Sequence, residues 1–497
     1  MAPMKLAIIG GGPSAFYVAS RLLARTPPDA TQMRIHMFDR LWAPHGLNCT
    51  HKFDAAATDP RFRFFGNVNV GQAFASIPHT LQLPLSAVFN NYTHVVFATG
   101  CALPTLHPDL PPSQYCMPAL SLVHWYTQHP SCPPPPPLER VTHVSLIGNG
   151  NVSLDVARML LTPVSVLEKY DVPVSVLDLL SRSRVKHVSI FGRRGPLEAA
   201  FTTKELRELM NLPDASMVPL SPEILEPAPA SNTTASSSTP TRQQARILQL
   251  LRQGSKNAPG STPKTWSLDF FRAPMHLAPP PPGSPLAQLT LAHTALDPTH
   301  KRAIATGATS TVSTSLVVTS LGFHAEPQAP FHDPTLMHMR TAPGGRVIDP
   351  SSSPSSSSVE GTVLKDVYAS GWAATGAKGV LASTMMNAYA VADAVLSDWL
   401  GRGVDSVPAP GIVTGTEPTA PPRDNARVVM NPSPHPEDPP EEVVEGMEAG
   451  LVMQYGDWKR VDDEEVKRGT LLGKERERMG WQEAKAFLDL SSTRGTS

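Results

Sequence analysis

Short apolar runs alternate with segments of helical periodicity near the start of the chain. Lys5–Gly10 is a brief apolar run, Phe16–Arg25 places its apolar residues at helical spacing, and Met33–Asp39 is again apolar and strand-like. This order predicts a β-α-β unit.

The same order returns further along the chain. His143–Gly148 is expected to form a strand, Val152–Leu161 a helix and His187–Gly192 the next strand. Two β-α-β units in one chain predict an α/β protein with two Rossmann-like nucleotide-binding domains.

Three more apolar runs end in small residues. Tyr92–Gly100 and Ser315–Gly322 fit ordinary buried strands with a glycine turn when periodicity alone is considered. Val367–Trp372 is a third strand of this type, and Gly376–Leu381 follows it before a helical run that ends at Leu400. Glycines in front of a helix permit close approach of the backbone to a ligand.

Proline is unusually frequent and clustered. The chain has 53 prolines in 497 residues, about twice the usual share of roughly 5%. Proline- and serine-rich stretches bury too little apolar surface to offset chain entropy, so they are expected to be solvated insertions or linkers. These insertions are expected near residues 131–138, 228–241, 277–285, 350–360 and 405–442.

Charge and cysteine content exclude several classes of protein. The formal net charge is −1, which excludes a general nucleic-acid binder. Cys49, Cys101, Cys116 and Cys132 form no C-x-x-C pair and no metal-type spacing with histidine, so a zinc site and disulfide exchange are not expected. No apolar run is long enough to span a membrane, and Met1–Lys5 leads directly into the first strand, which predicts no transit peptide in this sequence.

The first predicted strand runs into a glycine-rich turn. Gly10, Gly12 and Ala15 satisfy the pattern G-x-G-x-x-[G/A], which allows a tight turn, close approach of a pyrophosphate and close helix–strand packing. A lone match also occurs in ordinary strand–helix turns. Asp39 ends the next strand, where a carboxylate can accept hydrogen bonds from ribose hydroxyls, so a dinucleotide site is favoured.

The second unit carries a similar turn with a different strand end. Gly148-Asn149-Gly150-Asn151-Val152-Ser153 repeats the arrangement, and Arg193 and Arg194 follow the next strand. Guanidinium groups suit bidentate contact with a 2′-phosphate, so NADP(H) is preferred to NAD(H). The alternative is a solvated basic turn.

No catalytic side chain can be assigned from the sequence. No Ser-His-Asp or Cys-His order has supporting context, and Asp155 in the second predicted helix is the one candidate. The chemistry is therefore expected to come from bound cofactors.

Several longer segments together resemble the adrenodoxin reductase type of NADPH–ferredoxin oxidoreductase, a family of mitochondrial flavoproteins. The likeness covers nearly the whole chain apart from the insertions. The segments that carry it are Val144–Arg158, Gly192–Pro196, Phe201–Glu208, Phe270–Pro274, Ser370–Trp372, Gly379–Leu381, Asp457–Lys459 and Glu464–Gly469.

The resemblance implies two domains of the glutathione-reductase type. An FAD-binding domain would be formed by residues 1–103 and 329–497, and an NADP-binding domain by the inserted residues 104–328. It further implies that NADPH passes a hydride to FAD and that electrons then leave singly to a [2Fe–2S] ferredoxin. A monomer in the mitochondrion, with peripheral contact to the inner membrane and no nucleic-acid partner, is expected on the same ground.

Site residues are carried over by position in the matching segments. Those expected at FAD are Gly10, Gly12, Pro13, Ser14, Ala15, Asp39, Leu47, Val70, Trp372, Gly379, Val380 and Leu381. Those expected at NADPH are Asn149, Gly150, Asn151, Val152, Arg193, Arg194, Glu205 and Gly379. Arg242 and Arg246, four residues apart on one helix face, are expected to dock the ferredoxin, with an ordinary solvated helix face as the alternative.

The chain departs from the family in two places. A loop with an Asp-His-Pro word normally follows the position of Leu47 and is missing here, through a deletion or an error in the deduced sequence, and the segment Trp372–Gly379 is altered. A catalytically impaired relative that only binds a nucleotide or partner is therefore the alternative function. An amidotransferase-linked or disulfide-type flavoenzyme is disfavoured because a C-x-x-C pair and a cysteine-rich cluster region are absent.

Overall fold

The computed structural model describes residues 3–27, 32–45, 53–72, 77, 79–225, 240–297, 302–351, 361–401, 427–435 and 437–494. Leu47 and the segment after it lie outside the described residues, as does most of the insertions expected near 228–241, 350–360 and 405–442.

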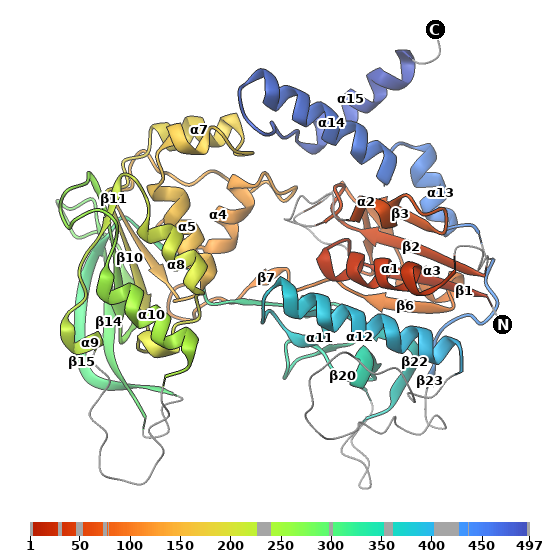
Figure 1. The fold of residues 1–497 in the computed structure, drawn as a ribbon, viewed down its shortest axis with the longest axis horizontal. Coiled ribbons are helices and arrows are strands. Elements are labelled where there is room, and N and C mark those ends of the chain that lie inside the picture. Colours follow the sequence, from red (N-terminus) through yellow and green to blue (C-terminus); the bar gives the residue numbers. More distant parts are fainter. Residues whose placement is uncertain are drawn as a thin grey trace. The chain divides into compact units, whose positions relative to one another are not determined.

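The chain divides into two compact units. The first comprises Met1–Leu103, Phe323–Glu464 and Met479–Ser497, and the second Pro104–Gly322 with Glu465–Arg478. In Figure 1 the red ribbon and most of the cyan-to-blue ribbon, from the two ends of the chain, share the first unit, and most of the second unit is drawn in orange, yellow and green. The two-part α/β fold predicted from the alternating pattern is confirmed.

The first unit is built on a nine-stranded sheet with the order β20-β21-β22-β6-β1-β2-β3-β24, and β23 pairs with β22. Its strands are β1 (Met4–Ile9), β2 (Met33–Asp39), β3 (Phe62–Gly66), β4 (Val68–Val70), β5 (Leu81–Leu83), β6 (His94–Phe97), β17 (Phe323–His324), β18 (His332–Asp333), β19 (His338–Met339), β20 (Thr341–Ala342), β21 (Arg346–Ile348), β22 (Val363–Ala369), β23 (Arg427–Val428) and β24 (Met453–Gln454). Its helices are α1 (Pro13–Arg25), α2 (Asp54–Ala57), α3 (Leu85–Asn91), η3 (Pro343–Gly345), α11 (Trp372–Thr375), α12 (Leu381–Trp399), α13 (Glu441–Glu448), α14 (Tyr455–Leu471, which continues into the second unit) and α15 (Trp481–Arg494).

Both faces of this sheet are covered. Leu6 and Ile8 of β1 pack into a core with residues of α1 and α12, whereas Ala7 and Ile9 face a second core with residues of α3 and α13. Because β1, β2, β3, β6 and β22 run parallel, their carboxyl ends lie at one edge of the sheet. In a doubly wound sheet this is the edge at which nucleotides bind.

The second unit has a six-stranded parallel sheet with the order β11-β12-β10-β9-β16-β8 and a three-stranded antiparallel sheet, β13-β14-β15. Its strands are β8 (Cys116–Pro118), β9 (His143–Ile147), β10 (His187–Gly192), β11 (Ala215–Met217), β12 (Lys264–Phe270), β13 (Arg272–Ala278), β14 (Ala287–Leu296), β15 (Ala303–Thr314) and β16 (Leu316–Thr319). The short strand β7 (Leu103–Pro104) lies at the point of the chain where the first unit ends and the second begins. Its helices are α4 (Ala119–Tyr126), α5 (Asn151–Leu161), α6 (Val164–Leu167), α7 (Val174–Ser181), η2 (Pro196–Glu198), α8 (Thr203–Met210), α9 (Pro222–Leu225) and α10 (Arg242–Gln253).

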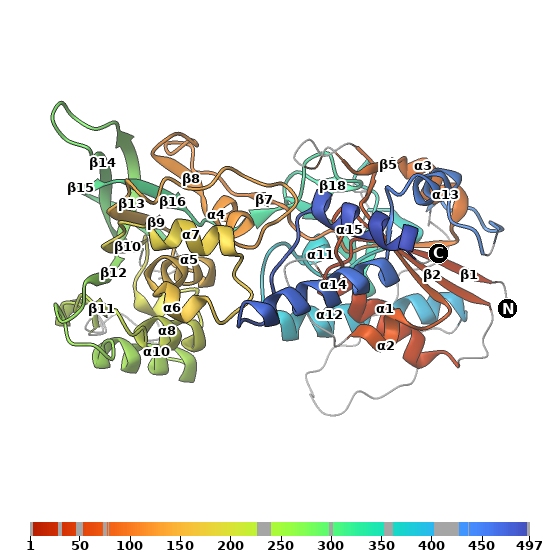
Figure 2. The same cartoon turned by 90° about the horizontal axis from the view of Figure 1, so that it is seen from above.

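The small sheet of this unit lies away from its helices. Figure 2 shows β14 and β15 on one side of the unit and α8 and α10 on the other. Leu289 and Leu291 of β14 pack with Ile147, Phe191 and Val317 of the large sheet, so the small sheet shares a core with the strands that carry the second glycine-rich turn. Among the described helices of the whole chain, none is long and apolar enough to cross a membrane.

Candidate cofactor sites

The first glycine-rich turn connects β1 to α1. Gly10 has a φ of 107°, and a Cβ built on it would overlap the Ala98 carbonyl oxygen, so only glycine fits. Gly12 has an extended backbone, and no atom lies within 4 Å of a Cβ built there. Pro13 occupies the first turn of α1, where its missing N–H costs no hydrogen bond. The turn therefore presents an accessible helix N-terminus, the arrangement that binds a pyrophosphate.

Asp39 closes this turn from the end of β2. Its carboxylate accepts hydrogen bonds from the backbone N–H of Gly11 at 2.5 Å and of Leu41 at 2.8 Å. Burial raises the pKa of Asp39 to about 6, and the two backbone hydrogen bonds act in the opposite direction. The predicted position of Asp39 beside the turn is thus observed, and the carboxyl group is held in a fixed place.

The end of β22 forms the neighbouring side of this site. The Ser14 and Ser370 hydroxyls lie 2.7 Å apart, and a Cβ on Gly371, whose φ is 63°, would come within 2.7 Å of the Ser14 side chain. The Asn387 side chain of α12 accepts a hydrogen bond from the Gly371 N–H at 2.7 Å. The start of α1, the end of β22 and α12 therefore meet at one edge of the sheet.

Trp372 and the start of α12 follow directly. The rings of Trp372 and Phe323 stack with centroids 6.2 Å apart, and the Cys101 thiol donates to the Trp372 carbonyl at 3.4 Å. Burial raises the pKa of Cys101 to about 11, so this thiol stays protonated at neutral pH. Gly379 has a φ of 88°, and Val380 and Leu381 are 54% and 52% exposed.

Two further residues, Val70 and Leu47, were also expected at FAD. Val70 ends β4 and pairs with Leu83 of β5, which places it in a separate two-stranded sheet. Leu47 lies outside the described residues.

The second glycine-rich turn connects β9 to α5. Gly148 has a φ of 128°, and a Cβ on it would overlap the Ser320 carbonyl oxygen, whereas Gly150 has open space around its Cβ position. The Asn151 side chain accepts from the Thr202 N–H at 2.8 Å, and the Asn149 carbonyl accepts from the Ala200 N–H at 2.9 Å. Val152 packs against the core of the unit. The segment before α8 therefore wraps the turn.

The arginines that follow β10 are accessible. The Arg193 side chain is exposed and Arg194 is half-buried. Within the described part of the chain, neither guanidinium forms an ion pair. Two unpaired guanidinium groups beside a helix N-terminus suit a phosphate ester.

Glu205 and Asp155 stand on neighbouring helices behind the turn. The Thr202 hydroxyl hydrogen-bonds the Glu205 carboxylate at the start of α8. Asp155 accepts from Arg158 at 3.0 Å, and Arg158 also pairs with Glu208. Burial raises the pKa of Asp155, and the Glu205 charge adds to the rise while Arg158 opposes it. The Arg158–Glu208 pair joins α5 to α8, and Asp155 shares Arg158 with it.

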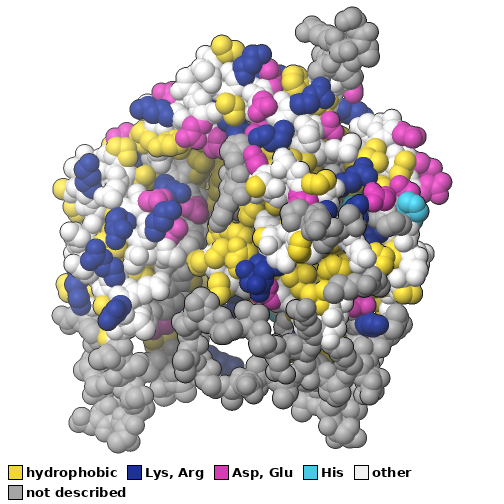
Figure 3. Space-filling view, turned by 45° about the vertical axis from the view of Figure 1, so that its right-hand side comes forward, with side chains coloured by type: hydrophobic (Ala, Val, Ile, Leu, Met, Phe, Trp, Pro, Cys, Tyr) yellow, Lys and Arg dark blue, Asp and Glu magenta, His cyan; other side chains and the backbone are white. Residues whose placement is uncertain are grey.

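The expected docking arginines lie on α10. Arg242 and Arg246 are exposed, and Arg246 donates to Gln249 at 3.1 Å. Thr241 and Gln244 cap the helix reciprocally, and the Gln244 side chain donates to the Leu197 carbonyl at 2.8 Å. Figure 3 shows several dark-blue lysine and arginine side chains on the left-hand body, which is the second unit.

Several residues at these sites were not predicted from the sequence. Ser370, Asn387 and Cys101 adjoin the first turn, and Thr202 adjoins the second. Asn387, a polar residue in the first half of α12, was the one available signal. Across the described ranges, no group of three or more His, Cys, Asp or Glu side chains is arranged to hold a metal ion.

Comparisons with known proteins agree with this arrangement. A family model described as FAD-NAD(P)-binding matches residues 7–57. The chain is 29% identical to the mitochondrial NADPH:adrenodoxin oxidoreductase of Bos taurus over 96% of this chain and 90% of that protein. It is 39% identical to the NADPH-ferredoxin reductase FprA of Mycobacterium tuberculosis over 44% of this chain and 49% of that protein. The solved structure of Mycobacterium tuberculosis FprA in complex with NADPH superposes with a TM-score of 0.72 at 25% identity, covering 98% of this chain and 99% of that one.

Proposed function

Because the chain belongs to the adrenodoxin reductase and FprA type of NADPH–ferredoxin reductases, we propose that it passes electrons from NADPH through FAD to a [2Fe–2S] ferredoxin. The observation that carries the proposal is the pair of glycine-rich turns, one beside Asp39 and the other beside Arg193 and Arg194.

The space around the glycines of each turn fits a bound dinucleotide. At each turn the first glycine has no room for a Cβ, and the second glycine, Gly12 or Gly150, has no atom within 4 Å of that position. A side chain at the second glycine would therefore occupy the space through which a pyrophosphate approaches the helix N-terminus.

The first unit is proposed to hold FAD. The N-terminus of α1 would bind the pyrophosphate, Asp39 would accept from the ribose hydroxyls, and Trp372 with Gly379–Leu381 would line the flavin ring. FAD supplies the chemistry of hydride acceptance and single-electron release when bound. The protein holds the Cys101 thiol protonated nearby, so no thiolate competes as a nucleophile.

The second unit is proposed to hold NADPH. The N-terminus of α5 would bind its pyrophosphate, and Arg193 with Arg194 would bind the 2′-phosphate. The remaining expected residues, Asn149, Asn151, Val152 and Glu205, support this site by bracing the turn and α8.

The ferredoxin is proposed to dock on the exposed face of α10. Arg242 and Arg246 present two positive charges there, which complement an acidic protein surface. A location in the mitochondrion is also proposed, because the animal relatives are named as mitochondrial. The resemblance to the family further suggests a monomer on the matrix side with peripheral inner-membrane contact. Because other relatives are bacterial, the family also occurs outside mitochondria, so cell fractionation is the experiment that tests the location.

The function is tested with purified protein reconstituted with FAD. NADPH-dependent reduction of cytochrome c that requires an added [2Fe–2S] ferredoxin is the expected result. Protein that stays colourless after reconstitution, or that passes no electrons to the ferredoxin, would overturn the proposal.

A second candidate function rests on the loop that is missing after Leu47. A relative without that flavin-side loop could retain the two nucleotide-binding units and yet be catalytically impaired, acting only by binding a nucleotide or partner. Measurable ferredoxin-dependent turnover would exclude this candidate. NADPH binding without turnover would support it.

A further inference from the structure

The turn that carries Arg193 and Arg194 is held by the small antiparallel sheet of the second unit. The Thr294 hydroxyl of β14 donates to the Arg193 carbonyl at 2.8 Å. The Phe271 N–H, between β12 and β13, donates to the Arg194 carbonyl at 3.4 Å. Both arginine carbonyls are therefore bound, while the two side chains stay available.

The two holding residues are bonded to each other. The Thr294 N–H donates to the Phe271 carbonyl at 3.0 Å, and the Arg272 side chain donates to the same oxygen at 3.0 Å. Thr294 is 9% exposed and lies where the pairing of β14 with β15 shifts register. Register shifts of this kind redirect side chains, and they are frequent beside functional sites.

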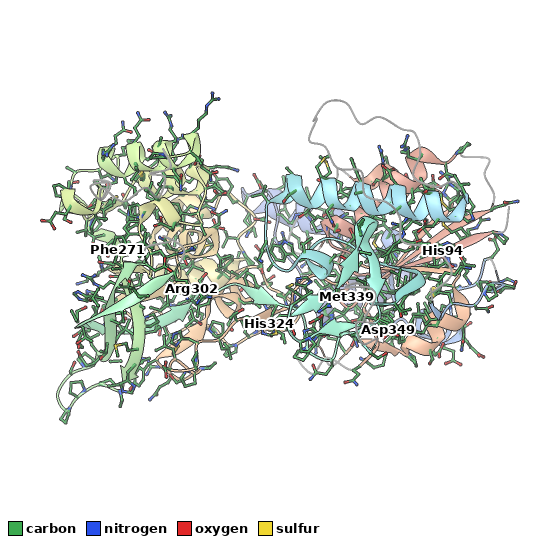
Figure 4. All side chains as sticks on the ribbon, turned by 90° about the horizontal axis from the view of Figure 1, so that it is seen from below. His94, Phe271, Arg302, His324, Met339 and Asp349 are labelled. Atoms are coloured by element: carbon green, nitrogen blue, oxygen red, sulfur yellow. The ribbon has the colours of Figure 1, made fainter. Side chains whose placement is uncertain are left out.

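Phe271 adopts a backbone conformation that its residue type rarely takes. Its φ is 58°, which is unfavourable for a bulky side chain and persists only where the surroundings enforce it. Its ring presses on Gly195, since a Cβ built on Gly195 would lie 2.6 Å from the ring. Figure 4 shows Phe271 among the green elements of this unit. The ring and the two carbonyl hydrogen bonds thus enclose the Arg193–Gly195 turn from one side.

We propose that Phe271 and Thr294 form a clamp that positions Arg193 and Arg194 for recognition of a 2′-phosphate. Phe271 and Thr294 are positioning residues, because they act through the arginine backbone and not on the ligand. A fixed turn leaves less backbone freedom to be lost when the guanidinium groups bind the phosphate. The inference rests on the proposed function, since NADPH is the ligand that would bring the 2′-phosphate.

The test compares two small ligands that differ by this phosphate. Binding of 2′,5′-ADP and of 5′-AMP to the full-length FAD-loaded protein is measured by calorimetry for wild type and Thr294→Val, which replaces the hydroxyl by a methyl group. We expect Thr294→Val to weaken 2′,5′-ADP binding about five- to tenfold and 5′-AMP binding less than about twofold. Thr294→Ser keeps the hydroxyl and is expected to restore the wild-type preference.

Two further variants separate the clamp from general damage to the sheet. Thr306→Val removes a hydroxyl that bonds the His293 carbonyl at 3.1 Å in the same sheet, and it should leave both affinities unchanged. Phe271→Gly permits the positive φ but removes the ring, and it should weaken 2′,5′-ADP selectively. Equal weakening of both ligands by Thr294→Val, or no change in either, would overturn the clamp. A wild type that binds 2′,5′-ADP no better than 5′-AMP would instead overturn the NADPH assignment itself, and the clamp with it.

Discussion

The two glycine-rich turns share one backbone design and differ in what the following strand places beside it. Gly10 and Gly148 both have a strongly positive φ, and both press against a carbonyl oxygen of a parallel strand end. At the first turn the neighbouring strand ends in Asp39, which is buried and bonded to two backbone N–H groups. At the second it ends in Arg193 and Arg194, which are accessible.

This difference follows from the chemistry of the groups to be recognised. A ribose hydroxyl is neutral, so a carboxylate can accept from it in a dry pocket where backbone N–H groups already support the charge. A 2′-phosphate is an anion that is strongly hydrated, and guanidinium groups that project from a fixed turn can bind it without being buried first. In the proposed function, the turn therefore binds the pyrophosphate and the strand end selects the nucleotide.

The largest effect is expected from breaking one turn and sparing the other. Gly148→Val would force a β-branched residue into a positive φ and against Ser320, so we expect NADPH binding to fall by more than about a thousandfold while FAD stays bound. Flavin content and NADPH calorimetry on the same preparation measure both. In the matched variant Gly150→Ala the new Cβ has no atom within 4 Å, so this variant should weaken NADPH binding without lowering the melting temperature. Loss of FAD from Gly148→Val would show that the two turns are not independent.

Replacing the strand-end charges of the second turn is expected to have the next largest effect. The double variant Arg193→Gln with Arg194→Gln should weaken NADPH about thirty- to a hundredfold and NADH by less than about threefold, because charge-assisted hydrogen bonds to the 2′-phosphate are lost. Dissociation constants for the two nucleotides measure this difference. Arg252→Gln, on the exposed surface of α10, serves as a control for loss of positive charge. An equal loss of affinity for NADPH and NADH would show that these arginines do not bind the 2′-phosphate.

The buried carboxyl of Asp39 is expected to make the free energy of unfolding depend on pH. The pKa of Asp39 is raised to about 6 in the folded protein, so its contribution to stability is fully present below the unfolded value of about 3.8 and is lost as the pH rises through about 6. Asp39→Asn has no such titration. In FAD-free protein, wild type should therefore gain about 2 kcal/mol of unfolding free energy relative to Asp39→Asn as the pH is lowered from 7.5 to 4. Denaturant titrations at these two pH values measure the gain, and a constant difference would contradict the raised pKa.

The local pattern of the sequence was enough to predict both turns. The first predicted helix begins at Phe16 and α1 begins at Pro13, a small difference because proline is tolerated in the first turn of a helix and disrupts one only further inside. The acid and the arginines at the strand ends lie where they were expected, because Asp39 is the last residue of β2 and Arg193 and Arg194 directly follow β10.

Contacts between distant segments could not be predicted in this way. Ser14 meets Ser370, and Thr294 meets Arg193, across long stretches of chain that carry no periodic signal for either pair. Residues 465–478 also pack with the second unit: the Lys474 ammonium donates to the Val172 carbonyl at 2.6 Å, and Arg478 pairs with Asp171 at 2.6 Å. A charged segment is expected to be solvated unless its partners are known, and these partners lie far away in the sequence.

The smallest effect is expected on α10, where positive charge would serve a protein and not a nucleotide. Arg242→Gln and Arg246→Gln should each raise the KM for the ferredoxin about threefold, and the effect should fade as salt is added, because exposed charges are screened. Reduction of a small acceptor by NADPH should stay unchanged, since neither side chain lies at a turn. Arg252→Gln, near the C-terminal end of α10, is the matched control. A rise in the KM for ferredoxin that persists at high salt would contradict a docking role for Arg242 and Arg246, and so would the same rise in Arg252→Gln. In that case, Arg193 and Arg194 would be the arginines of this unit for which a ligand is still proposed.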